Sequence, residues 1–150
     1  MMIISHKHKF IYLKATKVAG TSTEILLESI CDKDDIVTPI KWVDSKTHKP
    51  RNYSEYDFWS HISAEEVETK MGKLIFDSYY KFMSVRNPWD RMVSSYFWYI
   101  SQYKVSCTFD EFIEKPTLGY PPTRYPYSYW THTATKGYIL DDFIRYEYLM

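Results

Sequence analysis

The chain has 150 residues, the size of one ordinary domain with a single core. Hydrophobic residues make up 45% of it and charged residues 25%, which is typical of a globular protein rather than a disordered one. The 19 basic residues balance the 19 acidic ones, whereas a protein that coats nucleic acid normally carries a basic excess. We therefore expect no nucleic-acid partner.

The cysteines and the N-terminal residues bear on the compartment. Cys31 and Cys107 have no metal-like spacing and do not suggest a disulfide scaffold, which fits a reducing environment. The stretch MMIISHKHKF contains no long apolar run, so it is neither a signal peptide nor a membrane anchor. We expect a soluble, cytoplasmic protein with no membrane partner and no metal site.

The first predicted elements are a strand and a helix joined by a short turn. Residues 10–13 are apolar and typical of a short buried strand. Residues 21–30 follow as a helix, in which Thr21 and Glu24 have the spacing of a capping box.

The next region is mostly loop and ends in a second helix. Residues 33–54 are polar and contain two prolines, which favours a loop with a strand near 36–42. Ser63 and Glu66 form another capping box, which opens a helix that Gly72 ends.

A strand and a long helix follow. Residues 81–85 read as a strand, and Asn87 and Pro88 suit the cap and first position of a helix over 88–103. Five of its side chains give it an apolar face: Trp89, Val93, Tyr96, Phe97 and Ile100.

The remaining pattern completes an α/β arrangement. Thr108 and Glu111 predict a short helix to about Glu114, residues 117–127 a loop, and residues 138–148 one or two strands. Strands that alternate with helices indicate an α/β fold, a P-loop-like three-layer domain with a mainly parallel β-sheet flanked by helices. Both strand-to-helix junctions then open on the same edge of the sheet, where ligands bind in such folds.

The first junction, in FIYLKATKVAGTSTE, has the features of an anion site. Backbone N–H groups of Gly20, Thr21 and Ser22 start the helix, whose dipole favours an anion, and Lys17 adds a positive charge. A Walker A loop has its lysine after the second glycine, so the order here weakens an ATP-type interpretation. The alternative is that Thr21 only caps the helix and that Lys17 is solvated.

The second junction, FMSVRNPWDRMVSSY, predicts another anion site. Arg86 ends the strand and can hold a phosphate through two parallel hydrogen bonds, to which the hydroxyl of Ser94 can add a third. The alternative is that Arg86 pairs with Asp90 while Ser94 faces a polar groove.

Together these motifs resemble those of sulfotransferases that use 3′-phosphoadenosine-5′-phosphosulfate (PAPS). KATKVAGTS is similar to their 5′-phosphosulfate loop, SVRNPWDRMVSSY closely resembles their 3′-phosphate motif, and GYILDDFIRYEYL resembles a later segment with an Arg-x-Glu-x-Leu pattern. The resemblance covers about residues 9–149 and is nearest to carbohydrate-type sulfotransferases. It implies one sulfotransferase-like domain over residues 1–150, short of the C-terminal helices with which relatives usually continue.

The resemblance assigns roles to these residues. The donor is PAPS, the product is adenosine 3′,5′-bisphosphate, and the chemistry needs no metal. Lys17 matches the lysine that supports the leaving phosphate oxygen, and Arg86 and Ser94 match the ligands of the 3′-phosphate. The resemblance places the rest of the donor site along the first junction: Lys14, Thr16, Lys17, Val18, Ala19, Gly20, Thr21 and Ser22.

The acceptor hydroxyl requires a base, and the resemblance favours His61 in DFWSHISAEEVE. A neutral histidine is suited to taking a proton near pH 7. The alternative for His61 is a histidine that merely precedes a helix. His132 is the runner-up for the base, and Glu55 and Glu65 are weaker candidates.

Three departures from the family pattern stand out. Thr16 occupies a position where relatives usually have proline, and Glu24 lies one turn from the anion site, where its charge opposes the anion unless it points away. The chain ends at Met150. This leaves three alternatives: a minimal enzyme, a truncated one, or a homo-oligomer whose acceptor site is completed by another copy.

The acceptor is the least determined part. A carbohydrate or small alcohol is favoured, but the residues do not separate a glycan from a lipid or a peptide tyrosine. The aromatic stretch YPPTRYPY, which contains Arg124, is either a wall of the acceptor site or a plain connector. Two other functions compete with transfer: a non-catalytic remnant that binds 3′-phosphoadenosine nucleotides, and a P-loop kinase, which the absent Walker A loop disfavours.

Overall fold

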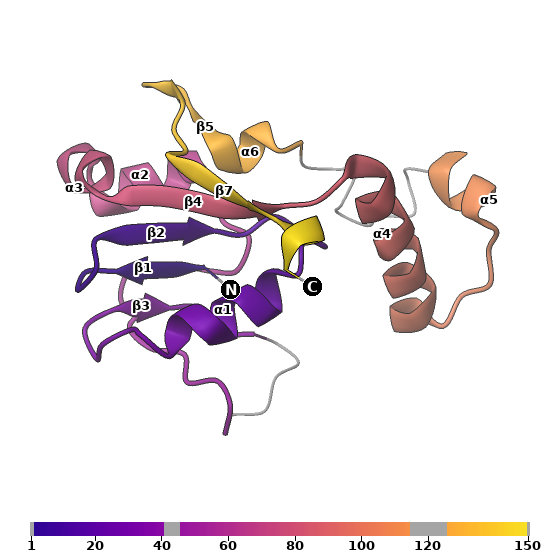
Figure 1. Cartoon of the computed structure of the whole chain (residues 1–150), viewed down its shortest axis with the longest axis horizontal. Coiled ribbons are helices and arrows are strands. Elements are labelled where there is room, and N and C mark those ends of the chain that lie inside the picture. Colours follow the sequence, from indigo (N-terminus) through magenta and orange to yellow (C-terminus); the bar gives the residue numbers. More distant parts are fainter. Residues whose placement is uncertain (1, 41–45, 115–125, 150) are drawn as a thin grey trace.

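The computed structural model describes residues 2–40, 46–114 and 126–149. Its centre is a five-stranded sheet in the order β3-β1-β2-β4-β7 (Figure 1). The strands of this sheet are β1 (Ile3–Ser5), β2 (Phe10–Leu13), β3 (Ile36–Val37), β4 (Tyr80–Val85) and β7 (Asp142–Arg145). A small separate hairpin consists of β5 (His132–Thr133) and β6 (Gly137–Tyr138).

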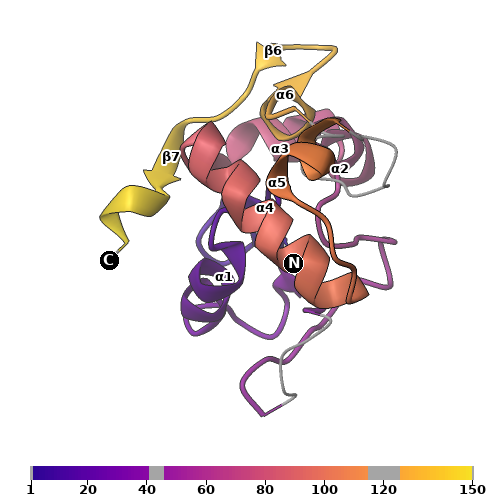
Figure 2. The same ribbon diagram turned by 90° about the vertical axis from the view of Figure 1, so that its right-hand side faces the viewer.

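Helices surround this sheet. They are α1 (Gly20–Glu28), α2 (Ala64–Met71), α3 (Lys73–Ser78), α4 (Pro88–Tyr103), α5 (Phe109–Glu114), α6 (Ser128–Thr131) and the 3₁₀ helix η2 (Tyr146–Tyr148). Figure 1 shows α4 at the end of the sheet toward which β2 and β4 point. Figure 2, seen from that end, shows α1 and α2 on opposite sides of α4.

The sheet is mixed, so the prediction of a mainly parallel sheet is wrong. β2 pairs in parallel with β4, and β4 with β7, whereas β1 pairs antiparallel with both β2 and β3. The cause is a hairpin at the N-terminus, because a turn at residues 6–9 is too short for the crossover that a parallel pair needs. Asp35 holds this turn by accepting hydrogen bonds from the backbone N–H groups of His6 and Lys7 at 2.7 and 3.1 Å.

Both faces of the sheet are covered, as the three-layer prediction requires. Ile4 and Ile11 belong to the larger core cluster, which includes Trp130 of α6. Their neighbours Ile3 and Tyr12 belong to a second cluster, against which Leu27 of α1 packs. This alternation follows the two-residue period of a strand.

The helix boundaries follow the predicted caps at three places. Ser63 and Glu66 form the expected capping box of α2. Asn87 accepts a hydrogen bond from the N–H of Trp89, and α4 occupies the predicted residues 88–103. The capping contacts of α5 are also formed, between Thr108 and Glu111.

The capping box predicted at the first helix is wrong. Helix α1 begins at Gly20, its N-cap is Ala19, and the cap makes no side-chain hydrogen bond. Glu24 is buried and pairs with Lys14 instead of reaching back to Thr21. A buried lysine partner is a stronger attraction for this carboxylate than a backbone N–H group.

The apolar face of the long helix is not the face that the protein buries. The side chains of Trp89 and Phe97 are 82% and 60% exposed, and the buried residues of α4 are Arg91, Ser95 and Tyr99. The helix therefore turns a polar side toward the sheet edge, which is where the candidate site lies.

Other predictions are met in part. The expected strand near 36–42 is confined to Ile36–Val37, and residues 138–148 contain the end of β6, the strand β7 and the turn η2. The loop expected at 117–127, including Arg124, lies almost wholly outside the described residues. Within the described ranges, no helix has the length and apolar character needed to cross a bilayer.

Candidate active site

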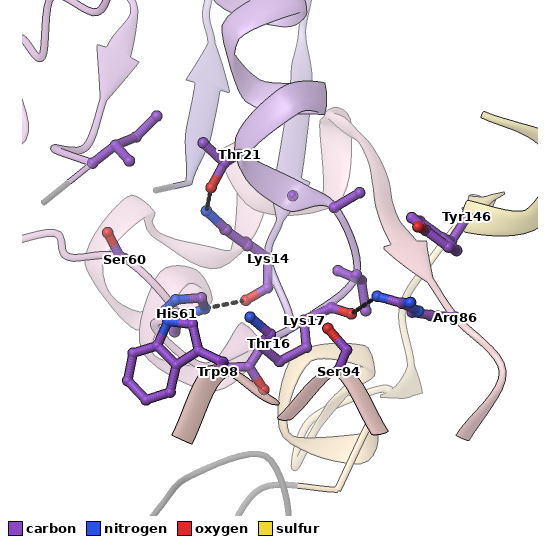
Figure 3. A pocket seen from close by; sticks show the side chains of 14 residues that line it. Lys14, Thr16, Lys17, Thr21, Ser60, His61, Arg86, Ser94, Trp98 and Tyr146 are labelled. Carbon is purple, nitrogen blue, oxygen red and sulfur yellow. Dashed lines mark hydrogen bonds between the residues drawn. The ribbon is translucent and has the colours of Figure 1, made fainter. Parts of the chain in front are cut away.

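The loop after β2 and the junction after β4 meet at one edge of the sheet, because these two strands are parallel neighbours. A cavity of about 610 Å³ opens between them (Figure 3). The residues predicted to bind the donor all line it except Ser22, whose side chain is exposed. Lys17 and His61, the predicted catalytic residues, line it as well.

Lys14 and Glu24 form a buried ion pair at the first junction. Lys14 Nζ lies 2.6 Å from Glu24 Oε2 and 3.3 Å from Thr21 Oγ1. Burial raises the pKa of Glu24, against the opposing effect of positive charges that include Lys14. Glu24 is fully buried, is paired with Lys14 and does not line the cavity.

Glycine is required at position 20 because the side chain of Lys14 passes close to it, not because its backbone adopts an unusual φ angle. A Cβ atom at this position would lie 2.6 Å from Lys14 Cε and 2.9 Å from Cγ. The aliphatic part of Lys14 therefore passes directly over the start of α1 on its way to Glu24. This is the close approach that only glycine permits.

Three residues that line the cavity have positive φ angles. Lys17, Ala19 and His61 have φ of 61°, 56° and 66°, the left-handed region that non-glycine residues rarely adopt. Each such residue costs free energy, and such strain clusters at functional sites. The three positions all belong to the lining of the cavity.

Lys17 directs its positive charge into the cavity. Burial lowers the pKa of its ammonium group, and the neighbouring Arg86 and Lys14 lower it further. Its Nζ lies 5.6 Å from the centre of the Trp98 ring. In the view of Figure 3, Lys17 lies between His61 and Arg86.

Arg86 pairs with Asp90 and also lines the cavity. Its Nε donates to Asp90 Oδ2 at 2.6 Å, as the simpler alternative predicts. Its Nη1 also donates to the carbonyl oxygen of Lys17 at 3.3 Å, and its guanidinium carbon lies 4.0 Å from the ring centre of Tyr146. Arg86 and Ser94 both line the cavity, so the pair with Asp90 does not remove Arg86 from the site.

His61 is held as a neutral imidazole of defined tautomer. Its Nδ1 lies 3.0 Å from the carbonyl oxygen of Lys14, and because a carbonyl can only accept, Nδ1 carries the proton. Nε2 therefore keeps the lone pair. Burial lowers the pKa of His61 to about 3, and nearby positive charges that include Lys14 and Arg91 contribute in the same direction.

A family model described as the sulfotransferase family matches residues 1–147. The chain belongs to the sulfotransferase family. No curated protein and no solved structure matches it. Membership indicates a transferase that moves sulfuryl groups, which implies an acceptor substrate.

The other candidate bases of this sulfotransferase lie away from the cavity. His132 is exposed on the β5–β6 hairpin, where its ring contacts Tyr138. Glu65 accepts a hydrogen bond from the backbone N–H of Ala134 at 2.6 Å, and Glu55 is exposed. In the part of the chain that the structure describes, no group of three or more His, Cys, Asp or Glu residues is arranged to hold a metal ion.

Arg91 is a component of the site that the sequence analysis missed. It is buried on α4, and its Nε and Nη2 donate to the carbonyl and hydroxyl oxygens of Thr16 at 2.9 and 3.0 Å. Arg91 lies three residues before Ser94 on one helical face, but its contact with Thr16 spans 75 positions of the sequence, so no local pattern reveals it. Arg91 thus ties the loop at Thr16 to the helix that carries Ser94.

Proposed function

We propose that this sulfotransferase transfers a sulfuryl group from PAPS to a hydroxyl acceptor. One observation carries the proposal: two cationic junctions and a neutral histidine line a single cavity. PAPS is anionic at both its 5′-phosphosulfate and its 3′-phosphate, so it matches a site with two separated anion-binding positions. The start of α1 suits the first group, and Arg86 with Ser94 suits the second.

The proposed step needs a base and a cation, which His61 and Lys17 supply. His61 Nε2 takes the proton of the acceptor hydroxyl while that oxygen forms a bond to sulfur. The bond between sulfur and the 5′-phosphate oxygen breaks, and Lys17 stabilises the negative charge that this oxygen gains. The negative charge of the bound donor raises the pKa of His61 from its low value in the free protein, toward the range in which a general base is effective.

We further propose that the acceptor is a carbohydrate or a small alcohol. Ile40, Ser60, His61 and Trp98 form one part of the cavity lining. An aromatic ring beside a hydroxyl and an imidazole suits a polyhydroxylated ring, which stacks on one face and hydrogen-bonds at its edge. A cytoplasmic location remains a prediction from the sequence.

The first test is calorimetric titration with adenosine 3′,5′-bisphosphate, beside ATP and AMP. We expect the bisphosphate to bind at least tenfold more tightly than AMP, and Arg86→Ala to remove that difference. Arg145→Ala is the matched control, since Arg145 is exposed on β7 and does not line the cavity. No binding, or a preference for ATP, would contradict the proposal. Tight binding without transfer to any acceptor in a broad screen would favour the non-catalytic nucleotide-binding alternative.

A further inference from the structure

The turn η2 lies against the second junction because of the sheet register. β4 and β7 are parallel neighbours, with Val85 paired to Arg145. The residues that follow each strand therefore leave the sheet at the same edge. This places Tyr146 and Glu147 next to Arg86 and Asn87.

Glu147 holds the peptide group that follows Arg86. Its Oε1 accepts a hydrogen bond from the backbone N–H of Asn87 at 2.8 Å. This hydrogen bond lowers the pKa of Glu147, so the side chain is a carboxylate at neutral pH. The side chain of Asn87 is also engaged, because it accepts from the N–H of Trp89 at the start of α4.

Two tyrosines hold Arg86 itself. The hydroxyl of Tyr127 accepts from the Arg86 N–H at 3.2 Å and donates to the Arg86 carbonyl oxygen at 3.0 Å. The Tyr146 ring lies 4.0 Å from the guanidinium carbon, a distance at which the planar cation stacks on an aromatic face. The backbone and the guanidinium plane of Arg86 are thus both fixed by residues outside its own motif.

From these contacts we infer that Glu147 and Tyr146 are positioning residues of the donor site, which orient Arg86 for the 3′-phosphate of the nucleotide. The inference rests on the proposed function. Two parallel hydrogen bonds to a phosphate require a defined guanidinium plane, and Tyr146 sets that plane while Glu147 sets the peptide from which the side chain extends. Loss of either residue weakens recognition of the 3′-phosphate and leaves recognition of the 5′-phosphate intact.

The test measures bisphosphate and AMP affinities by calorimetry for wild type, Glu147→Ala and Glu147→Gln. We expect Glu147→Ala to weaken bisphosphate binding about five- to tenfold, the effect of losing one ordinary hydrogen bond, with AMP affinity unchanged. Glu147→Gln keeps an accepting oxygen and should restore part of the affinity. In an Arg86→Ala background, Glu147→Ala should have no further effect, because both changes act on the same phosphate contact.

Tyr146 offers a second test that does not depend on Glu147. Tyr146→Phe keeps the ring and should bind the bisphosphate like wild type, whereas Tyr146→Ala should bind it several-fold more weakly. Tyr148→Ala is the control, because Tyr148 belongs to the same turn, is 77% exposed and does not line the cavity.

The outcomes separate this inference from the proposed function. Glu147→Ala with wild-type bisphosphate affinity, or with equal losses for the bisphosphate and AMP, overturns the positioning role and leaves the proposed function standing. Wild-type protein that binds the bisphosphate no better than AMP overturns the proposed function, and the positioning role with it. If Glu147→Ala does not fold, the two Tyr146 variants decide the question.

Discussion

The carbonyl oxygen of Lys14 accepts the Nδ1–H of His61 at 3.0 Å, while the side chain of Lys14 reaches Glu24 at 2.6 Å. One residue at the end of β2 therefore orients the candidate base with its backbone and anchors α1 with its ammonium group. Lys14 thus contacts both His61, the residue proposed to remove the proton, and α1, the helix proposed to bind the anion.

The assignment of the base predicts that His61→Ala lowers turnover about 10²- to 10⁴-fold, the usual contribution of a general base. Bisphosphate affinity should change little, because the proposed role of His61 is to contact the acceptor and not the nucleotide. Turnover is measured with labelled donor and an acceptor found by screening, or with water in the slow background reaction. His132→Ala is the matched control and should retain wild-type turnover. The opposite pattern would make His132 the base.

The low pKa of His61 predicts an acid sensitivity of the fold. His61 has a pKa of about 3 in the folded protein, against an ordinary value of 6.5. Between these two values the unfolded chain binds more protons than the folded one, so this residue makes the free energy of unfolding fall as pH falls. His61→Gln removes that contribution, and its stability should decline less steeply than that of wild type over this window.

Urea denaturation at several pH values between 7 and 4 measures this slope. His132→Gln is the control for loss of a histidine as such, since His132 is exposed. Equal slopes for wild type and His61→Gln would show that His61 is not buried as a neutral side chain.

Lys17 is expected to act on the leaving group. Lys17→Ala should slow transfer about 10²- to 10³-fold, the effect of removing one group that stabilises developing charge. Its effect on bisphosphate binding should be much smaller, because the start of α1 and Arg86 remain in place. Single-turnover transfer and calorimetry on the same variant separate the two effects. Normal turnover in Lys17→Ala would refute the role.

Gly20→Ala tests the close approach of Lys14 to α1. Alanine is ordinarily the better helix former, so propensity alone predicts a gain in stability. The new Cβ would lie 2.6 Å from Lys14 Cε, and Lys14 cannot move without breaking its buried pair with Glu24. We therefore expect a loss of about 1–3 kcal/mol in the free energy of unfolding. Ser22→Ala, an exposed change in the same turn, should be nearly neutral, and a Gly20→Ala protein as stable as wild type would refute the argument.

Patterns of neighbouring residues in the sequence predicted much of the fold. The strand at 10–13 and the helix at 88–103 occur as predicted, because an apolar run and an Asn-Pro cap are both decided by neighbouring residues. The strand β1 escaped prediction because its three residues are too few to show a period. Without it, the antiparallel part of the sheet could not be foreseen.

For the candidate site too, the sequence predicted some features and not others. The family-like motifs predicted which residues gather at the cavity, since parallel pairing of β2 and β4 brings both junctions to one edge. The contacts that hold them were not predictable. Arg91 bonds Thr16 across 75 positions of the sequence, and Glu147 bonds Asn87 across 60. Such contacts depend on how helices and strand ends pack, and no pattern of neighbouring residues encodes them.

Arg91 gives the last prediction, because its guanidinium group connects α4 to the first junction through two hydrogen bonds to Thr16. A lysine keeps the charge but lacks the planar fork that reaches both oxygens. We therefore expect Arg91→Lys to lower the free energy of unfolding by about 1.5–3 kcal/mol, the range for hydrogen bonds to charged groups. Bisphosphate affinity should fall as well, since the loop from Thr16 to Thr21 loses its tie to the helix that carries Ser94. Urea denaturation and calorimetry measure the two effects, with Arg145→Lys as the exposed control. If Arg91→Lys matched wild type in both, the two junctions would have to be held together by other contacts.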